Sequence, residues 1–282
     1  MGLGGRGALT AGGGESAVAA SDPMTDPRRA SPTLPSARFS DYDPLAWLYD
    51  RHWGRAFADR AVPALDRLLL DGLPSGSRLL DLCCGTGHLA RVLAGRGFVV
   101  TGLDGSEEML KLARRTVSGV EWVLADARSF DLPGTFDAVL SVFDSLNHVL
   151  RPEELQAVFG NVHRTLRPGG SFLFDLNMDA GYRARWRGSI SGVEADHVYV
   201  ARATYDPDVG AGRFDVTTFV QRDGWRRQDL TFTQRCYSED QVRSALDAAG
   251  FRVIGAYDAV GDLGLSGDVG RTFFLARAVE RR

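Results

Sequence analysis

The chain has 282 residues, 44% of them hydrophobic, which is enough to bury one large core that carries an insertion. A net charge of −3 and the lack of any lysine- and arginine-rich run argue against nucleic acid or an anionic membrane as a partner. Three cysteines, two of them adjacent, do not suit a disulfide framework, so we expect a reducing, cytoplasmic setting.

The N-terminal segment is poor in large apolar side chains. Residues 1–36 are mostly Gly, Ala, Ser and Pro and cannot offset the entropy of ordering, which predicts a disordered tail. No apolar stretch in the sequence has the length of a signal peptide or a membrane helix. Met24 stays open as an alternative to Met1 as the start residue. Residues 42–73 carry apolar side chains at helical spacing, which predicts one or two amphipathic helices.

The next hundred residues alternate short apolar runs with helical patterns. The runs are "SRLLDL" (77–82), "FVVTGLD" (98–104), "VEWVLAD" (120–126), "FDAVLSVF" (136–143) and "SFLFDLN" (171–177). Strands that alternate with helices at this spacing predict an α/β fold, with a parallel sheet covered by helices on both faces.

The pattern changes after Asn177. Residues 196–205, 212–221 and 225–237 alternate polar and apolar side chains, and "RDG" joins the last two runs as a hairpin turn. This predicts a three-stranded antiparallel sheet inserted into the α/β core, which resumes with a helix and two apolar runs. The expected organisation is a tail (1–36), a cofactor-binding core (37–177), an antiparallel β insertion or lid (178–237) and a completion of the core (238–282).

A glycine-rich loop follows the first expected strand. In "LLDLCCGTGHLA" (79–90), Gly85, Gly87 and Ala90 fit the pattern G-x-G-x-x-[GA] of dinucleotide-binding loops. Asp104 ends the second expected strand, where a carboxylate can accept both hydroxyls of a ribose. These residues predict an adenosine-type ligand and leave an NAD(P)- or FAD-dependent oxidoreductase open.

Three further features favour a different ligand. Asp81 lies inside the first strand, where a dinucleotide fold more often carries only apolar residues. Asp126 follows the third strand, where its carboxylate can accept from the exocyclic amine of adenine. No second mononucleotide-binding half follows in the sequence to hold a nicotinamide.

Five segments carry a family resemblance. In their order and spacing, "LLDLCCGTG", "GLDGSEEML", "ADARSF", "FDAVLSVFDSLNHV" and "LRPGGSFLFDLN" resemble class I S-adenosylmethionine-dependent methyltransferases, from about Tyr42 to the C-terminus. The resemblance implies a Rossmann-like sheet of seven mostly parallel strands, the last one antiparallel, and S-adenosylmethionine as cofactor. Cys83 departs from the family pattern D-x-G-x-G-x-G, because it stands at the first glycine. "FDSLNH" and the β insertion are more weakly similar to small-molecule methyltransferases that act on amino-sugars.

The resemblance also implies which residues bind the cofactor. The first strand and its loop would hold the amino-acid moiety, the second strand the ribose, the third-strand loop the adenine, and the N-terminal helix the carboxylate, while the fourth strand would line the site. The residues of the first strand and its loop are Asp81, Cys83, Gly85 and Gly87, and the ribose residue is Asp104. Asp126 and Ala127 would bind the adenine, and Tyr49 and Arg51 the carboxylate. Ser141 is the residue of the fourth strand that would line the site.

The expected reaction is an in-line displacement of the methyl group from a sulfonium, for which the protein mainly positions the acceptor and excludes water. His148 is the candidate base, because the ordinary pKa of histidine lies near working pH. Asp144 and Asn147 in the same loop are candidates for binding an amine or hydroxyl acceptor. We therefore expect a small-molecule acceptor under the insertion. A regulatory protein that binds the cofactor without turnover stays an alternative.

Three remaining features concern partners. Cys83, Cys84 and His88 lack the spacing of a tetrahedral metal site, so we expect no metal. An exposed antiparallel sheet offers a pairing surface for a homodimer. The arginines of "GYRARWRG" (181–188) are either a solvated face or a recognition site for an acidic substrate.

Overall fold

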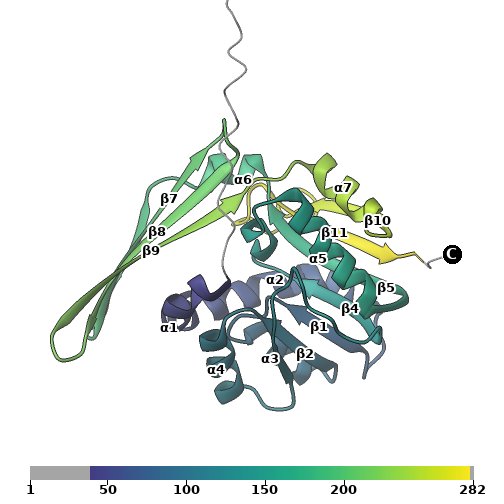
Figure 1. Cartoon of the computed structure of the whole chain (residues 1–282), viewed down its shortest axis with the longest axis horizontal. Coiled ribbons are helices and arrows are strands. Elements are labelled where there is room, and N and C mark those ends of the chain that lie inside the picture. Colours follow the sequence, from purple (N-terminus) through teal and green to yellow (C-terminus); the bar gives the residue numbers. More distant parts are fainter. Residues whose placement is uncertain (1–38, 280–282) are drawn as a thin grey trace, which may run out of the picture. The chain divides into compact units, whose positions relative to one another are not determined.

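A computed structural model describes residues 39–279 of the chain (Figure 1), so the predicted tail of residues 1–36 lies outside the described residues. Within the unit of residues 34–282, the strands form a seven-stranded sheet and a four-stranded sheet. The strands of the large sheet are β1 (Arg78–Leu82), β2 (Val99–Asp104), β3 (Glu121–Leu124), β4 (Phe136–Ser141), β5 (Leu166–Asn177), β10 (Phe251–Asp258) and β11 (Arg271–Ala278).

The large sheet has the order β10-β11-β5-β4-β1-β2-β3. Its strands pair in parallel except for β11, which runs antiparallel to both β5 and β10. The predicted Rossmann-like sheet with an antiparallel last strand is therefore confirmed. The chain reverses its strand order between β1 and β4, and ligands of such sheets bind at the carboxyl ends of the strands near this reversal.

The helices begin and end where local sequence signals allow. Ser106 starts α4 by accepting a hydrogen bond from the Met109 N–H, and Ser238 and Gln241 form a reciprocal cap at the start of α7. The α-helices are α1 (Ala46–Tyr49), α2 (Arg55–Leu68), α3 (His88–Gly95), α4 (Glu107–Thr116), α5 (Pro152–Thr165), α6 (Asp179–Arg185) and α7 (Glu239–Ala248). Short helical turns are η1 (Phe39–Leu45), η2 (Asp50–Gly54, a π-helix), η3 (Leu70–Gly72) and η4 (Ser145–His148).

Each face of the large sheet buries its own apolar cluster. The cluster under α5 and α7 includes Phe159, Phe172 and Phe174, all fully buried. The cluster under α2 and α3 is built mainly from leucine and alanine, and includes the fully buried Leu65 and Leu93. The sheet is thereby fixed between two helical layers, as the alternating pattern predicts, and its carboxyl edge stays available for a site.

The insertion is a sheet of four strands and not three, in the order β6-β7-β8-β9. Its strands are β6 (Ser189–Val193), β7 (His197–Asp206), β8 (Ala211–Gln221) and β9 (Trp225–Arg235). The sequence reasoning missed β6 because this short edge strand is mostly exposed and contains Gly192. The glycine is needed there, since a Cβ atom would lie 2.3 Å from the ring of Tyr199.

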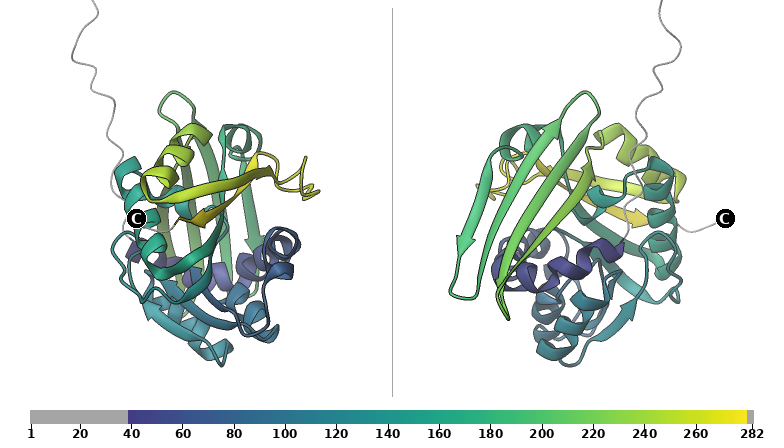
Figure 2. Two further views of the ribbon diagram at one scale, coloured as in Figure 1. Left: turned by 90° about the vertical axis from the view of Figure 1, so that its right-hand side faces the viewer. Right: turned by 60° about the vertical axis from the view of Figure 1, so that its left-hand side comes forward.

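The four-stranded sheet, called the insertion sheet below, packs beside the N-terminal helices (Figure 2). One face of it buries Tyr199, Val216 and Phe232 against Leu45 and Leu48. The N-terminal helices and the insertion sheet together therefore enclose the carboxyl edge of the large sheet. Among residues 39–279, no helix is long and apolar enough to cross a membrane.

Candidate active site

The loop between β1 and α3 turns tightly at two glycines. Gly85 and Gly87 have φ angles of +54° and +78°, in the left-handed region that favours glycine. A Cβ atom at Gly87 would also meet the ring of Trp122 at 2.5 Å. Cys83, with φ of +61°, is a side-chain-bearing residue in the same strained region. The loop therefore presents backbone and one thiol to the carboxyl edge of the sheet.

Asp104 ends β2 beside this loop. Its Oδ2 accepts a hydrogen bond from the Gly85 N–H at 2.8 Å, and its Oδ1 accepts one from the Ser106 N–H at 2.8 Å. Burial raises the pKa of the Asp104 carboxyl, while these backbone N–H groups favour its ionised form. Each oxygen of a carboxylate has a second acceptor position, so Asp104 can still bind two hydroxyl groups.

Asp126 follows β3 and is held by its neighbour Arg128. Arg128 donates from Nη2 to Oδ2 at 2.6 Å and from Nε to Oδ1 at 2.9 Å. Burial would raise the pKa of Asp126, but the hydrogen bonds and charge of Arg128 lower it below its ordinary value. Next in sequence, the carbonyl of Ala127 accepts a hydrogen bond from Asn161 Nδ2 at 3.0 Å. The third-strand loop is thus fixed, with an ionised carboxylate at its start.

These segments line a cavity of about 550 Å³, a size typical of small-molecule sites. One part of its wall comes from the ends of β1 to β3, and another from the N-terminal helices, α6 and the insertion sheet. The predicted site residues that the cavity brings together are Tyr49, Cys83, Gly85, Asp104, Asp126, Ala127, Asp144 and His148.

His148 lies in the part of the cavity nearer the insertion sheet. Its Nε2 lies 2.5 Å from the Tyr42 hydroxyl and 2.9 Å from Gln234 Nε2. The Gln234 amide is oriented by Tyr182, whose hydroxyl donates to Oε1, so its nitrogen donates to His148 and Asp144. Burial lowers the pKa of His148 to about 4. The imidazole is therefore neutral at pH 7, with Nε2 as a hydrogen-bond acceptor.

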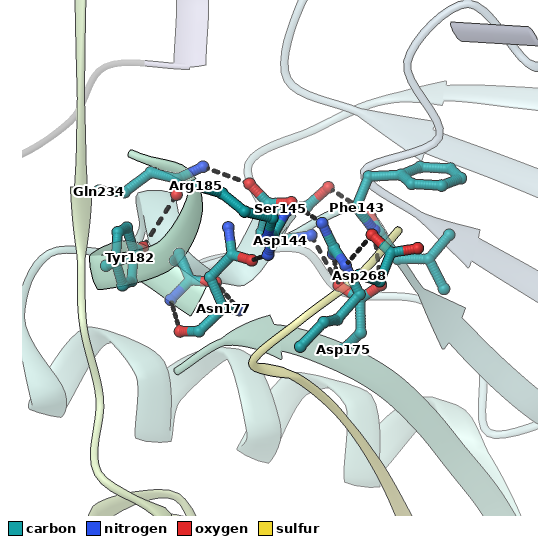
Figure 3. A network of polar contacts seen from close by, with 12 residues as sticks. Phe143, Asp144, Ser145, Asp175, Asn177, Tyr182, Arg185, Gln234 and Asp268 are labelled. Carbon is teal, nitrogen blue, oxygen red and sulfur yellow. Dashed lines mark hydrogen bonds and ion pairs between the residues drawn. The ribbon is translucent and has the colours of Figure 1, made fainter. Parts of the chain in front are cut away.

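A buried ionic network supports this part of the cavity (Figure 3). Arg271 contacts Asp144 at 2.7 Å, Asp175 at 2.9 Å and Asp268 at 3.2 Å. Asp175 also accepts hydrogen bonds from the backbone N–H groups of Phe143 and Asp144. The φ angles of these two residues, +66° and +50°, are uncommon for residues that carry a side chain. The network therefore holds the loop after β4 in a strained conformation at the cavity wall.

Asp81 lies behind the glycine loop rather than in the large cavity. Its side chain is 2% exposed, and Oδ2 has no hydrogen-bond partner among the described residues. Burial raises the pKa of Asp81 to about 8, with the nearby charge of Asp104 adding to the shift. Asp81 lines a small cavity of about 20 Å³ that shares Tyr49 and Cys83 with the large one. This carboxyl is a buried polar group available to a ligand that reaches past Cys83.

Besides Asp81, the structure leaves four predicted site residues outside the large cavity. The Arg51 guanidinium pairs with Asp196 of the insertion at 2.8 Å. The Asn147 amide is buried and donates to the backbone carbonyl groups of residues 177 and 235. Ser141 is buried at the end of β4, and Gly87 serves as the N-cap of α3. In this structure, Arg51 forms a surface ion pair with the insertion, and Asn147 links the loop after β4 to β5 and β9.

Several cavity residues were missed in the sequence. Tyr42, Gln234 and Arg271 come from segments far from the glycine loop, and their contacts with the loop after β4 depend on the tertiary fold. The alternating pattern of β9 could have predicted Gln234, because it places Gln234 on the same face of the strand as Phe232, and both line the cavity. The aromatic residues of the lining are Tyr42, Tyr49, Trp53, Phe57, Phe143, Trp186, Phe214 and Phe232.

Comparison with known proteins identifies the family. Residues 79–170 match the family model described as a methyltransferase domain. The chain is 30% identical over 244 residues to the putative methyltransferase YqeM of Bacillus subtilis, covering 84% of this chain and 96% of that protein. The chain belongs to the S-adenosylmethionine-dependent methyltransferases. The predicted family is confirmed, and the dinucleotide-dependent oxidoreductase alternative is wrong.

Other methyltransferases are similar over most of their length. The dTDP-3-amino-3,6-dideoxy-alpha-D-glucopyranose N,N-dimethyltransferase of Streptomyces fradiae is 30% identical over 219 residues, covering 74% of this chain and 84% of that protein. The crystal structure of DesVI from Streptomyces venezuelae is 27% identical with a TM-score of 0.66, covering 84% of this chain and 98% of that chain. The structure of SAM-bound CalS10, an amino pentose methyltransferase from Micromonospora echinaspora, is 26% identical with a TM-score of 0.63, covering 84% and 96%.

The site of this methyltransferase suits the chemistry of its cofactor. S-adenosylmethionine carries two ribose hydroxyls, an adenine amine and an ammonium as hydrogen-bond donors. The Asp104 and Asp126 carboxylates line the cavity as acceptors, and the unpartnered Asp81 Oδ2 is a third acceptor behind Cys83. The residues present therefore fit the donor groups of the cofactor.

Proposed function

We propose that this methyltransferase transfers the methyl group of S-adenosylmethionine to a small-molecule acceptor bound beneath the insertion sheet. The observation that carries the proposal is the cavity, which continues from the glycine loop to the inner face of the insertion sheet. Its aromatic lining and its volume of about 550 Å³ favour a small organic ligand over a polymer.

The proposed cofactor end of the cavity uses the residues at the carboxyl edge of β1 to β3. Asp104 would accept the ribose hydroxyls, and Asp126 with the Ala127 N–H would bind the adenine edge. Gly85 lacks a side chain, so its backbone would lie close to the amino-acid moiety. Asp81 would bind the ammonium from behind Cys83, because its Oδ2 is buried and lacks a partner. Support for these roles comes from the position of each group on the cavity walls.

The proposed reaction is an in-line displacement onto an amine or hydroxyl. When bound, the cofactor supplies a methyl group on a sulfonium, which is a good leaving group. The protein then has to hold the acceptor atom in line and keep water out. Trp53, Phe57, Phe143 and Phe214 would exclude water, since their rings line the cavity between the N-terminal helices and the insertion sheet.

We assign His148 a positioning role rather than the role of general base. A base works best when its pKa lies near the working pH, and burial lowers the pKa of His148 to about 4. Because Nε2 of the neutral imidazole already faces Gln234 and Tyr42, His148 would instead orient the Tyr42 hydroxyl, whose oxygen would accept the N–H or O–H of the acceptor. Such a hydrogen bond would turn the acceptor's lone pair toward the methyl group.

A labelling experiment tests the acceptor class. The protein is incubated with S-adenosylmethionine labelled in the methyl group and an extract of source cells that lack this gene. The extract is then separated into small-molecule, protein and nucleic-acid fractions. We expect the label in the small-molecule fraction. Label confined to protein or nucleic acid would contradict the proposal.

A cavity-filling variant tests where the acceptor binds. Ala201 of β7 is 1% exposed and lines the cavity, so Ala201→Trp should block the acceptor and leave binding of S-adenosylhomocysteine unchanged. Val200 is the matched control, because it lies next to Ala201 on β7 with its side chain on the exposed face. Val200→Trp should retain both binding and transfer. Full transfer by Ala201→Trp would place the acceptor elsewhere.

A further inference from the structure

Five arginines line the cavity, and they divide into two groups by their partners. Arg128 is neutralised by Asp126, and Arg271 by three aspartates. Arg60, Arg185 and Arg187 form no ion pair with any carboxylate in the part of the chain that the structure describes. The cavity wall therefore has three guanidinium groups without a direct ion pair; Asp144, Asp175 and Asp268 act on Arg185 from a distance, whereas Arg60 and Arg187 have no carboxylate partner among these described residues.

The contacts of these three arginines leave guanidinium N–H groups available. Arg60 of α2 lies over the Phe57 ring, with its guanidinium carbon 4.9 Å from the ring centroid. Arg185 donates from Nε to the carbonyl of Val269 at 3.0 Å and from Nη2 to the Asn177 side chain, both neutral acceptors. Arg187 donates from Nε to the Ala184 carbonyl at 3.2 Å. Each retains donors that no protein carboxylate occupies.

The three side chains border one part of the cavity. Arg60 lies close to Gly267 and Arg185 contacts Val269, so both lie beside the loop that precedes β11. Arg187 follows Arg185 by two residues, just after the end of α6. We call Arg60, Arg185 and Arg187 the arginine rim. It includes two of the arginines of "GYRARWRG", whose role the sequence left open.

Arg183 provides a contrast within the same helix. Its guanidinium pairs with Asp179 at 2.6 Å, and it does not line the cavity. Arg183 outside the cavity thus has a carboxylate partner, whereas Arg60 and Arg187 at the cavity wall have none among the described residues. An unneutralised cation beside aromatic rings is stabilised when an anion binds it, and the planar guanidinium matches carboxylate and phosphate groups with paired hydrogen bonds.

We propose that the methyl acceptor carries an anionic group, a carboxylate or a phosphate, which binds to the arginine rim. This inference rests on the proposed function, in which the same cavity holds the acceptor. The anionic group binds at the rim, while the atom to be methylated lies deeper, near His148 and Tyr42. The rim therefore selects acidic acceptors over neutral ones of the same size.

Two probe anions test the rim in the protein loaded with S-adenosylhomocysteine. Pyrophosphate represents the phosphate group and malonate the carboxylate, each titrated at constant ionic strength. Binding is followed by tryptophan fluorescence, because Trp186 and Trp53 line the cavity, and by the rise in melting temperature. We expect saturable binding of at least one probe to the wild-type complex. The stronger probe identifies the anion class.

Paired variants separate the rim from general surface charge. Arg187→Ala and Arg60→Ala should each lower the affinity for the probe anion about tenfold, because each variant loses a charge-assisted hydrogen bond. Arg183→Ala on α6 and Arg55→Ala on α2 are the matched controls, since both arginines pair with aspartates and neither lines the cavity. These two controls should bind the probe as the wild type does.

The outcomes distinguish this inference from the proposed function. If S-adenosylhomocysteine binds and neither anion binds saturably, the arginine rim is refuted and the methyltransferase function stands. The rim is also refuted if the control variants weaken probe binding as much as the rim variants do. If S-adenosylhomocysteine itself does not bind, the proposed function fails, and the inference about the acceptor fails with it.

Discussion

Replacing Arg271 by methionine should be one of the most destabilising single changes in this protein. Arg271 is 7% exposed and compensates Asp144, Asp175 and Asp268. Its removal leaves buried carboxylates without a cation, which costs about 3–5 kcal/mol of folding free energy. For a domain of this size, each kcal/mol lowers the melting temperature by roughly 2–4 °C, so we expect a loss of about 10 °C.

The loss of stability in Arg271→Met should be larger at neutral pH than at acidic pH. Burial raises the pKa of Asp175, an effect that Arg271 opposes, so in Arg271→Met this pKa rises further. A carboxyl with a raised pKa in the folded state holds a proton that the unfolded chain releases. Its unfavourable effect is therefore largest at neutral pH and shrinks as the pH falls toward the unfolded value near 4.

Urea unfolding at about pH 7.5 and about pH 5 measures both effects. Arg277→Met is the matched control, because Arg277 is exposed on the same strand and its substitution should change stability by less than about 0.5 kcal/mol. The reasoning is refuted if Arg271→Met loses less than about 1 kcal/mol at pH 7.5, well below the cost of breaking a buried pair. A greater loss of stability at pH 5 than at pH 7.5 would refute it as well.

Three further predictions concern the walls of the site. Gly87→Ala should lower the free energy of unfolding by about 1–3 kcal/mol more than Gly119→Ala does. Both glycines have positive φ, but only at Gly87 would the added Cβ atom meet the Trp122 ring. As the pH falls from about 6.5 to about 4, the wild type should lose stability more steeply than His148→Gln does. In this range His148 binds a proton in the unfolded chain but stays neutral in the folded protein, where burial lowers its pKa to about 4. The Cys83 thiol should resist iodoacetamide at pH 8 in the folded protein, since burial raises its pKa.

Each of these predictions has a contrary outcome. Equal unfolding free energies for the two glycine variants would remove the packing argument for Trp122. Parallel pH profiles of urea unfolding for the wild type and His148→Gln would show an ordinary histidine pKa. Mass spectrometry that finds Cys83 alkylated as fast in the folded protein as in urea would show an exposed or ionised thiol.

The sequence predicted which strand ends reach the cavity, because the relevant rules are local. A parallel strand that ends in a glycine turn or a carboxylate delivers that group to the carboxyl edge of the sheet, whatever the rest of the chain does. Gly85, Asp104 and Asp126 follow from this rule, and all three line the cavity. The parallel pairing of β1 to β5 follows from the same alternation of strands and helices, and the family resemblance implied the antiparallel last strand.

The part of the cavity nearer the insertion sheet could not be predicted in the same way, because it depends on contacts between distant segments. Tyr42 meets His148 across 106 residues, and Arg271 meets Asp144 across 127. Arg51 was expected at the cofactor, but Asp196 of the insertion sits close enough to bind it. Asn147 and Asp144 share a loop, yet the turn η4 directs one into the fold and leaves the other at the cavity.

Calorimetric titration with S-adenosylhomocysteine, comparing the wild type with Asp104→Asn, tests the central claim most directly. The asparagine keeps the size of the side chain and removes the charge and one acceptor oxygen, and thermal unfolding verifies that the variant is folded. We expect the wild type to bind S-adenosylhomocysteine and not NADH, and Asp104→Asn to bind S-adenosylhomocysteine at least about tenfold more weakly. Unchanged affinity in the folded variant, or binding of NADH alone, would contradict this claim.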